Sequence, residues 1–239
     1  MQRAYGISLR PGPWRDSQRE TTNIALRGIP RLSMRLHVSE GDNIWAQTFE
    51  EIIMSETTVM SIPGYKAGTW TIDKTHSSVS FSIRHIVISK VRGTFDDFDA
   101  TFVTGENPLD TSITASAKVV SINTNETNRD GHLRTGDFFD AETYPTIDFA
   151  STGMREVKGE YLVDGNITIK GVTKPATFEI DFGGFGTDPY GNYKFGATAK
   201  TEVNREDFGL TYNAALETGG MLLGDKVAIT LELQAALEA

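Results

Sequence analysis

Hydrophobic and polar residues alternate with a period of two from Trp70 onward. In residues 78–83, Val79, Phe81 and Ile83 fall on one face and three serines fall on the other. This pattern predicts antiparallel strands with one buried face. It recurs in residues 161–169, 178–182, 193–199 and 227–233, so we count about eight or nine strands up to residue 237.

Turn residues separate these segments, with Gly and Pro clusters at 158–159, 171–175 and 188–192. Asp164-Gly165 falls inside a strand, which predicts a bulge or bend there. Only residues 85–91 and 126–133 look able to form short helices. A meander of this kind removes its edges by closing. We therefore predict an all-β fold, an antiparallel barrel of about eight strands with one or two short helices.

The first 53 residues differ from the rest, because they contain Arg but no Lys and show no sustained period. Residues 54–58 (Met-Ser-Glu-Thr-Thr) read like an ordinary protein start. We expect residues 1–53 to be a non-core or disordered N-terminal extension, 54–65 a lead-in, and 66–239 the barrel domain. A basic targeting peptide is the alternative for the extension, but acidic residues such as Asp16 and Glu20 weaken it.

The composition removes several classes of function. There is no Cys, which excludes disulfides, thiolate metal sites and a cysteine nucleophile. The net charge of −9 repels nucleic acid and anionic membranes unless a basic patch intervenes, and no run rich in Lys and Arg supplies one. Apolar runs fall short of the ~18 residues of a membrane span. We expect no nucleic-acid partner and no stable membrane insertion. The lack of a recognisable signal peptide leads us to expect a cytoplasmic location.

Whether the barrel is hollow depends on the size of its inward side chains. Several positions on apolar faces are small, namely Ala115, Ala117, Gly165, Ala197 and Ala199. Small inward residues on several strands predict unfilled space, which natural interiors rarely tolerate without an occupant. The alternative is a taper of large and small side chains that fills the interior completely. Both interpretations remain open on the residues alone.

Charged residues and phenylalanines crowd together in residues 129–140, between two strand-like runs. Arg129 and Asp130 could form a structural latch that holds this segment against the barrel. His132 and Arg134 could instead meet the polar head of a ligand. A second polar segment, 204–210, contains Arg205 and Asp207 and is interpreted as a turn and latch.

Catalytic and metal sites have little support in the sequence. His76, His85 and His132 occur in no metal-binding spacing, and no nucleophile elbow or phosphate cradle is recognised. We predict no metal and no cofactor. An acid–base pair of His132 with Asp130 remains the enzymatic alternative.

A series of short motifs occurs in a fixed order along residues 66–237. They are Trp70-Thr71-Ile72-Asp73; His76-Ser77 with Val79, Phe81, Ile83 and His85 at alternate positions; Gly93 with Phe95; Arg129-Asp130 with His132-Leu133; Asp137-Phe138-Phe139-Asp140; Tyr144-Pro145; 165–175 (Gly-Asn-Ile-Thr-Ile-Lys-Gly-Val-Thr-Lys-Pro); and Asn204-Arg205 with Asp207-Phe208-Gly209. This set closely resembles the YceI-like family of bacterial lipid-binding proteins.

The resemblance implies an extended lipocalin-like antiparallel barrel that forms a homodimer and encloses a long hydrophobic pocket. Relatives carry polyisoprenoids, isoprenoid quinones or fatty-acid amides, without a firmly attached catalytic activity. Several relatives are periplasmic and carry a cleaved signal, from which this chain departs.

These observations lead to one functional expectation, a non-enzymatic protein that binds and transports or stores a long-chain amphipathic lipid. The alternatives are an enzyme of isoprenoid or quinone metabolism and a stress-response barrel with a filled core. The expected head-group contacts are His85, His132 and Arg134, and the expected latch residues are Arg129, Asp130, Arg205 and Asp207. The expected apolar lining consists of Phe81, Ile83, Phe95, Phe98, Leu133, Phe138, Phe139, Phe149, Ile167, Ile169, Phe178 and Ile180.

Overall fold

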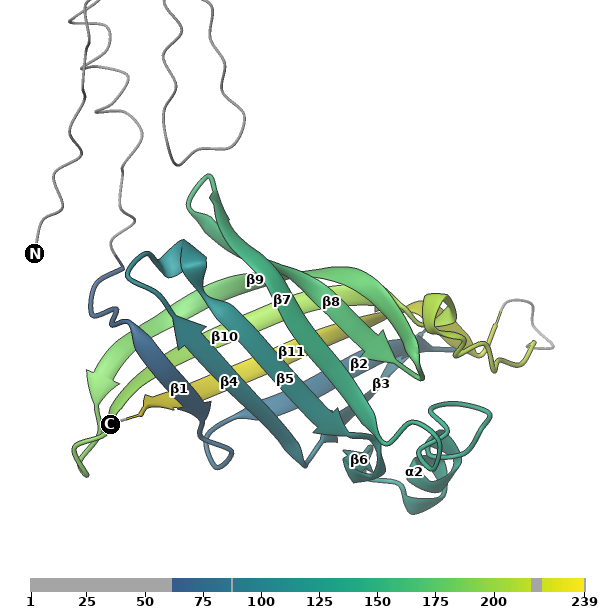
Figure 1. The fold of residues 1–239 in the computed structure, drawn as a ribbon. Helices are drawn as coiled ribbons and strands as arrows, with labels where there is room; N and C mark the ends of the chain where they lie inside the picture. The colour runs from purple at the N-terminus through teal and green to yellow at the C-terminus, as the bar shows by residue number, and fades with distance from the viewer. Residues whose placement is uncertain (1–61, 87, 216–220, 239) are drawn as a thin grey trace, which may run out of the picture. The chain divides into compact units, whose positions relative to one another are not determined.

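The computed structural model describes residues 62–86, 88–215 and 221–238, and this part of the chain forms a closed antiparallel β-barrel (Figure 1). The predictions for residues 1–53, and most of those for 54–65, lie outside the described residues. The strands are β1 (Gly68–Ile72), β2 (Ser78–His85), β3 (Ser89–Phe95), β4 (Phe98–Thr104), β5 (Ser112–Lys118), β6 (Ile122–Asn123), β7 (Thr146–Val157), β8 (Glu160–Ile169), β9 (Val172–Thr187), β10 (Tyr193–Asn204) and β11 (Leu223–Leu237).

Strand β11 closes the barrel, because its two parts pair with two different strands. Its C-terminal part pairs with β1, with Trp70 opposite Leu237, and its N-terminal part pairs with β2, with Ile83 opposite Val227. Thus β1 and β2 lie end to end and share one position in the wall. The next position is shared by β4, which pairs with β1, and β3, which pairs with β2. The third is shared by β5, which pairs with β4, and β6, which pairs with β3. The strand segments therefore occupy eight positions around the wall, and the predicted eight-stranded barrel is confirmed.

Three of the eight wall positions are each divided between two short strands, and the breaks between these strands lie next to one another. They fall at residues 73–77, 96–97 and 119–121, the last of which forms the 3₁₀ helix η2 (Val119–Ser121). Backbone hydrogen bonds still cross the breaks, from Asp96 N–H to Ser121 O at 3.2 Å and from Lys118 N–H to Asp97 O at 2.8 Å. We call this line of interruptions the seam.

One of the two predicted short helices is present. Helix α2 (Thr127–Leu133) begins where Glu126 accepts hydrogen bonds from the N–H groups of Asn128 and Arg129, at 3.0 and 2.6 Å. Further 3₁₀ turns are η1 (Pro108–Asp110) and η3 (Arg205–Phe208).

The prediction of a helix near residues 85–91 is wrong. This segment instead contains the end of β2, a turn and the start of β3, with His85 paired to Ser89. The turn includes Ile86 at φ +51°, a value that no right-handed helix contains. The β-branched residues of the segment favour strands, and the period-two alternation simply continues through the hairpin.

The predicted bulge at Asp164-Gly165 is confirmed, although the extra residue lies on the partner strand. The β7–β8 register shifts between Ser151 and Gly153, opposite Asp164 and Gly165. A side chain at position 165 would overlap the ring of Phe149. Gly165 therefore makes room for an aromatic ring, and the prediction that it leaves unfilled space is wrong.

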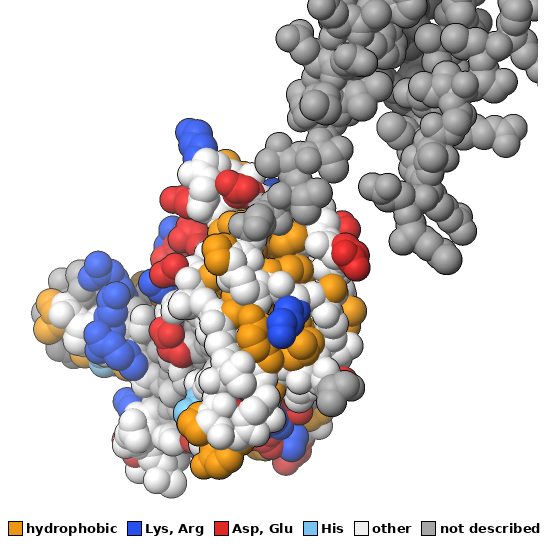
Figure 2. Space-filling view, turned by 90° about the vertical axis from the view of Figure 1, so that its left-hand side faces the viewer, with side chains coloured by type: hydrophobic (Ala, Val, Ile, Leu, Met, Phe, Trp, Pro, Cys, Tyr) orange, Lys and Arg blue, Asp and Glu red, His pale blue; other side chains and the backbone are white. Residues whose placement is uncertain are grey.

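Figure 2 looks onto the end of the barrel that carries the β9–β10 hairpin and the end of β11. Hydrophobic side chains gather there around a basic side chain. In this region Lys66 Nζ lies 3.7 Å from the centroid of the Tyr193 ring, and the Tyr65 ring packs edge-on against Phe185. Aromatic side chains thus pack against one another and against a lysine at this end.

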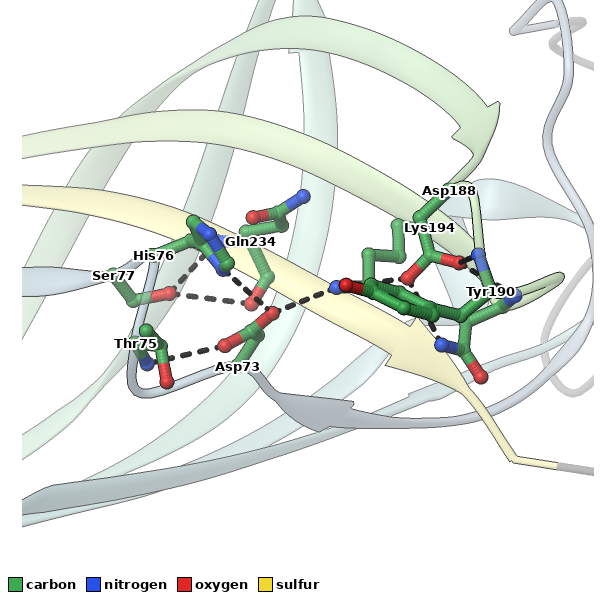
Figure 3. Close-up of polar contacts among 9 residues, drawn as sticks. Asp73, Thr75, His76, Ser77, Asp188, Tyr190, Lys194 and Gln234 are labelled. Carbon is green, nitrogen blue, oxygen red and sulfur yellow. Dashed lines mark hydrogen bonds and ion pairs between the residues drawn. The ribbon is translucent and has the colours of Figure 1, made fainter.

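A polar cluster ties the β1–β2 connection to the β9–β10 hairpin at the same end (Figure 3). Lys194 Nζ lies 2.7 Å from Asp73 Oδ2 and 3.3 Å from Asp188 Oδ2. His76 Nδ1 lies 2.9 Å from the same Asp73 oxygen, and Asp73 N–H donates to Gln234 O on β11 at 2.7 Å. The cluster therefore joins three separate parts of the wall.

The cluster also sets the ionisation of its carboxylates. Hydrogen bonds from Lys194 and then from His76 lower the pKa of Asp73 to about 2. Hydrogen bonds from Asn192 and also from Lys194 lower the pKa of Asp188 to about 2. A carboxyl group whose pKa is lower in the folded state stabilises the fold above its unfolded pKa, here about 3.8. That stability is lost as the pH falls through about 2.

We expect Lys194→Met to lower Tm at neutral pH and to flatten the loss of stability between about pH 4 and pH 2. The reason is that both carboxylates lose the cation that favours their charged form. Thermal unfolding followed by circular dichroism across this pH range measures both effects. Lys118→Met is the control, because the Lys118–Asp97 pair at 2.6 Å is exposed and should contribute little. Equal acid profiles for wild type and Lys194→Met would contradict the assignment.

Candidate functional site

A cavity of about 430 Å³ runs inside the barrel. At the end that Figure 2 faces, its wall includes Ile62, Tyr65 and Phe185. At the opposite end, near α2 and η3, its wall includes His132 and Tyr212. The cavity therefore extends along the barrel between its two ends, and its volume lies in the range of small-molecule sites. A completely filled core does not match this interior.

All the residues predicted to form an apolar lining lie on the wall of this cavity. Period-two alternation places the strand residues among them there, since successive side chains of a strand point to opposite faces of the sheet. Leu133 instead ends α2, and Phe138 and Phe139 lie in the segment between α2 and β7. Whether the lining residues contact a ligand stays a prediction. The full set is Phe81, Ile83, Phe95, Phe98, Leu133, Phe138, Phe139, Phe149, Ile167, Ile169, Phe178 and Ile180.

Small side chains on the wall account for part of the cavity volume. Ala115, Ala117, Ala197 and Ala199 all lie on the wall, as the sequence predicted. Gly165 differs, because Phe149 occupies the space beside it.

Several large aromatic wall residues were missed by sequence reasoning. Phe182 lies two residues beyond Ile180, and Phe195 lies two residues before Ala197, so the alternation already contained the signal for both. Trp70 is fully buried, and its Nε1 donates to Thr104 Oγ1 at 3.0 Å. The missed aromatic residues are Tyr65, Trp70, Phe102, Phe182, Phe185, Phe195, Phe208 and Tyr212.

His132 brings a polar group to the cavity wall at the α2 end. Its Nε2 lies 2.9 Å from Asp137 Oδ2, and its ring packs edge-on against Phe138 and Tyr212, with centroids 5.1 and 5.0 Å away. The imidazole is therefore held in one orientation. The acid–base pair predicted for the enzymatic alternative is not formed, because the carboxylate bonded to His132 belongs to Asp137 and not to Asp130.

Arg129 and Asp130 both act on Thr124, in the segment before α2. Asp130 is buried, and its Oδ1 accepts hydrogen bonds from Thr124 N–H at 2.8 Å and from Thr124 Oγ1 at 2.5 Å. Arg129 Nε donates to Thr124 Oγ1 at 2.7 Å, and its Nη2 donates to Thr124 O at 2.9 Å. The expected latch contacts are thus made to Thr124, which no sequence motif had singled out. Arg129 also reaches the cavity wall.

The other two predicted head-group residues, His85 and Arg134, lie away from the cavity wall, and this corrects the prediction. Arg134 follows α2, and its Nη2 donates to Ile122 O at 2.9 Å, so its guanidinium is used to hold the helix. His85 ends β2, and its carbonyl accepts a hydrogen bond from Ser89 Oγ at 3.0 Å. Neither is among the described residues that line the cavity.

Arg205 anchors the segment after η3. It is 3% exposed, its Nε donates to Gly224 O at 2.9 Å, and its Nη1 donates to the carbonyls of Leu210 and Tyr212. Gly209 takes φ +74°, as expected of a turn glycine.

The prediction of Asp207 as a latch residue is corrected, because its side chain is exposed. The carboxylates near Arg205 Nη2 are those of Glu206, at 3.6 Å, and Asp225, at 3.8 Å. Arg205 thus holds this segment mainly by donating hydrogen bonds to backbone carbonyls.

Within residues 62–86, 88–215 and 221–238, His, Asp and Glu side chains form no cluster of three or more that could hold a metal ion. None of the helices described in the structure has the length and apolar character needed to cross a membrane.

Comparisons with known proteins agree with this architecture. A family model described as "YceI-like domain" matches residues 70–235. A UPF0312 protein of Staphylococcus aureus strain MSSA476 is 40% identical over 161 residues, which cover 66% of this chain and 91% of the relative. The crystal structure of a YceI protein from Campylobacter jejuni aligns with a TM-score of 0.57 at 27% identity, covering 75% of this chain and 100% of that one. A polyisoprenoid-binding domain from Saccharophagus degradans, implicated in plant cell wall breakdown, aligns with a TM-score of 0.53 at 15% identity. That alignment covers 71% of this chain and 98% of the other.

Proposed function

The chain belongs to the YceI-like domain family, and on that premise we propose that its barrel binds a long-chain amphipathic lipid without turning it over. The lipid is a polyisoprenoid, an isoprenoid quinone or a fatty-acid amide. The bound state shields the lipid from water, so the protein transports or stores it.

The apolar cavity is the observation that carries this proposal. Its wall is built from the inward Phe, Ile, Val, Leu and Ala side chains of the barrel strands. Each CH₂ moved from water into such a site contributes about 0.8 kcal/mol, so a buried segment of about ten carbons contributes about 8 kcal/mol before the costs of binding are subtracted. Shape and burial therefore provide affinity with few polar contacts. The polyisoprenoid-binding domain from Saccharophagus degradans, which shares the fold, supports the same class of ligand.

The two ends of the cavity differ in polarity, and this difference suggests how the lipid lies. His132 and Arg129 bring an imidazole and a guanidinium to the wall at the α2 end. At the other end Ile62, Tyr65 and Phe185 provide mostly aromatic and aliphatic surface. We infer that the polar head lies beside α2 and that the chain extends toward the β9–β10 hairpin.

No observation favours the enzymatic alternative, since the structure separates His132 from Asp130. The homodimer and the cytoplasmic location stay predictions.

We expect protein purified under native conditions to retain lipid. Extraction with organic solvent followed by mass spectrometry should release a long-chain isoprenoid or acyl species in near-stoichiometric amount, because burial in the cavity slows its loss. An unrelated protein carried through the same purification is the control. Protein that arrives empty and then fails to take up fluorescent isoprenoid and acyl probes would contradict the proposal.

A further inference from the structure

Exposed hydrophobic side chains gather at the β2–β3 turn and the adjoining start of β11. Ile88 is 88% exposed, Met221 48% and Ile86 39%. Ile86 N–H donates to Leu222 O at 2.9 Å, which places the turn beside this segment. We call Ile86, Ile88 and Met221 the apolar tip. A single exposed hydrophobic residue is common on protein surfaces, but several that lie together mark a candidate interaction site.

Basic residues lie directly behind the apolar tip. Arg84 on β2 lies opposite Lys90 on β3, and Arg92 follows two residues later on the same outward face. All three are exposed, whereas Val91 between the last two lines the cavity. Residues 84–92 contain no acidic residue, in a chain whose net charge is −9.

This basic patch corrects the expectation from the sequence that none exists. The three residues are not consecutive, so they form no Lys- and Arg-rich run. The hairpin register brings them together on one face. Two acidic side chains near this end, Glu206 and Asp225, lie 3.6 and 3.8 Å from the buried Arg205 guanidinium, whose single positive charge offsets part of their charge. The exposed Asp207 lies next to Glu206 in the chain.

We propose that the apolar tip and its basic patch form a docking surface for an anionic lipid bilayer. Ile86, Ile88 and Met221 enter the head-group layer, while Lys90 and Arg92 contact anionic head groups. The contact is peripheral and involves no spanning segment. Projecting side chains on a turn with cations behind them fit a bilayer interface better than a flat protein surface.

The position of the docking surface relates it to the cavity. Val91 and Leu222 lie on the cavity wall and belong to the same two segments as the apolar tip. A docked barrel would hold this end of its cavity against the bilayer. The docking surface goes beyond the proposed lipid binding and can be tested without any bound lipid.

Co-sedimentation of the full chain with vesicles tests the proposal. We expect binding to vesicles of phosphatidylcholine with phosphatidylglycerol, weak binding to phosphatidylcholine alone, and loss of binding as salt is raised. Lys90→Gln with Arg92→Gln should weaken binding about 25-fold, since each basic residue near an anionic surface contributes about fivefold. Ile88→Ser should weaken it about tenfold, because a hydrophobic side chain no longer enters the interface.

Matched variants separate docking from general surface effects. Tyr190→Ser removes an equally exposed hydrophobic residue, 89% exposed, from the β9–β10 hairpin, and Lys158→Gln with Lys200→Gln removes two exposed lysines from other strands and turns. Both should bind vesicles like the wild type. The docking surface would be overturned if these controls lost as much binding as the test variants. It would also be overturned if binding did not depend on phosphatidylglycerol, or if Ile88→Ser changed the oligomeric state and left vesicle binding unchanged.

The docking surface and the proposed function fail in distinguishable ways. A protein that carries lipid but ignores vesicles would overturn only the docking surface. A protein that binds vesicles but is empty and takes up no probe would contradict only the proposed function.

Discussion

Ala115→Phe should abolish most lipid binding while leaving the barrel folded. Ala115 lies on the cavity wall and is only partly buried, so its side chain borders open space. A benzyl group there would occupy room that the lipid chain needs. If the ring displaces about four methylenes, the loss is about 3 kcal/mol, or roughly 150-fold in Kd. Titration with a fluorescent isoprenoid or acyl probe measures the change.

The neighbouring strand offers a matched control for this substitution. Ala150 follows Phe149, the residue paired with Ala115, and is exposed on the outer face of the barrel. Ala150→Phe adds the same ring outside the cavity and should bind probe like the wild type. Overpacking can cost about 1–3 kcal/mol of stability, so Tm is measured for both variants. Full binding by a folded Ala115→Phe would show that the lipid does not lie in this cavity.

Arg205→Met should be among the most destabilising single substitutions in the barrel. Methionine retains much of the aliphatic stem but removes the donors that serve the carbonyls of Gly224, Leu210 and Tyr212. Loss of one side of such a buried, charge-assisted network typically costs about 3–5 kcal/mol. We therefore expect Tm to fall by about 10 °C, measured by differential scanning calorimetry.

An exposed arginine provides the comparison for this prediction. Arg155 Nε lies 2.6 Å from Asp164 Oδ2 on the barrel surface, and its side chain is 48% exposed. Arg155→Met should cost no more than about 1 kcal/mol. If both substitutions lower Tm equally, the backbone contacts of Arg205 do not carry the stability assigned to them.

Local alternation predicted the parts of the structure that depend only on which face a side chain takes. Phe81, Ile167 and Phe178 could be assigned to the cavity wall because a strand has only two faces. The bulge at Asp164-Gly165 could be predicted because glycine inside a strand pattern usually marks a close approach. Counting alternating segments predicted eight or nine strands, whereas the described residues form eleven, because three of the eight wall positions each consist of two shorter strands.

Other features depend on contacts between distant parts of the chain. The Lys194–Asp73 pair joins residues 121 positions apart, and no local pattern specifies it. The basic patch needs the register of Arg84 with Lys90. Sequence proximity also suggested Asp130 as the partner of His132, but Asp130 bonds to Thr124 and His132 bonds to Asp137.

The seam has a mechanical consequence for the barrel. A barrel made of continuous strands resists a change in its cross-section, because all the hydrogen bonds between two neighbouring strands would have to break together. Here three adjacent wall positions are interrupted along one line, while β7 to β11 run without such breaks. Local opening occurs most readily where the fewest bonds must be broken. We therefore expect this side of the wall to deform most easily when ligands of different diameter enter the barrel. The side formed by the uninterrupted strands β7 to β11 should remain rigid.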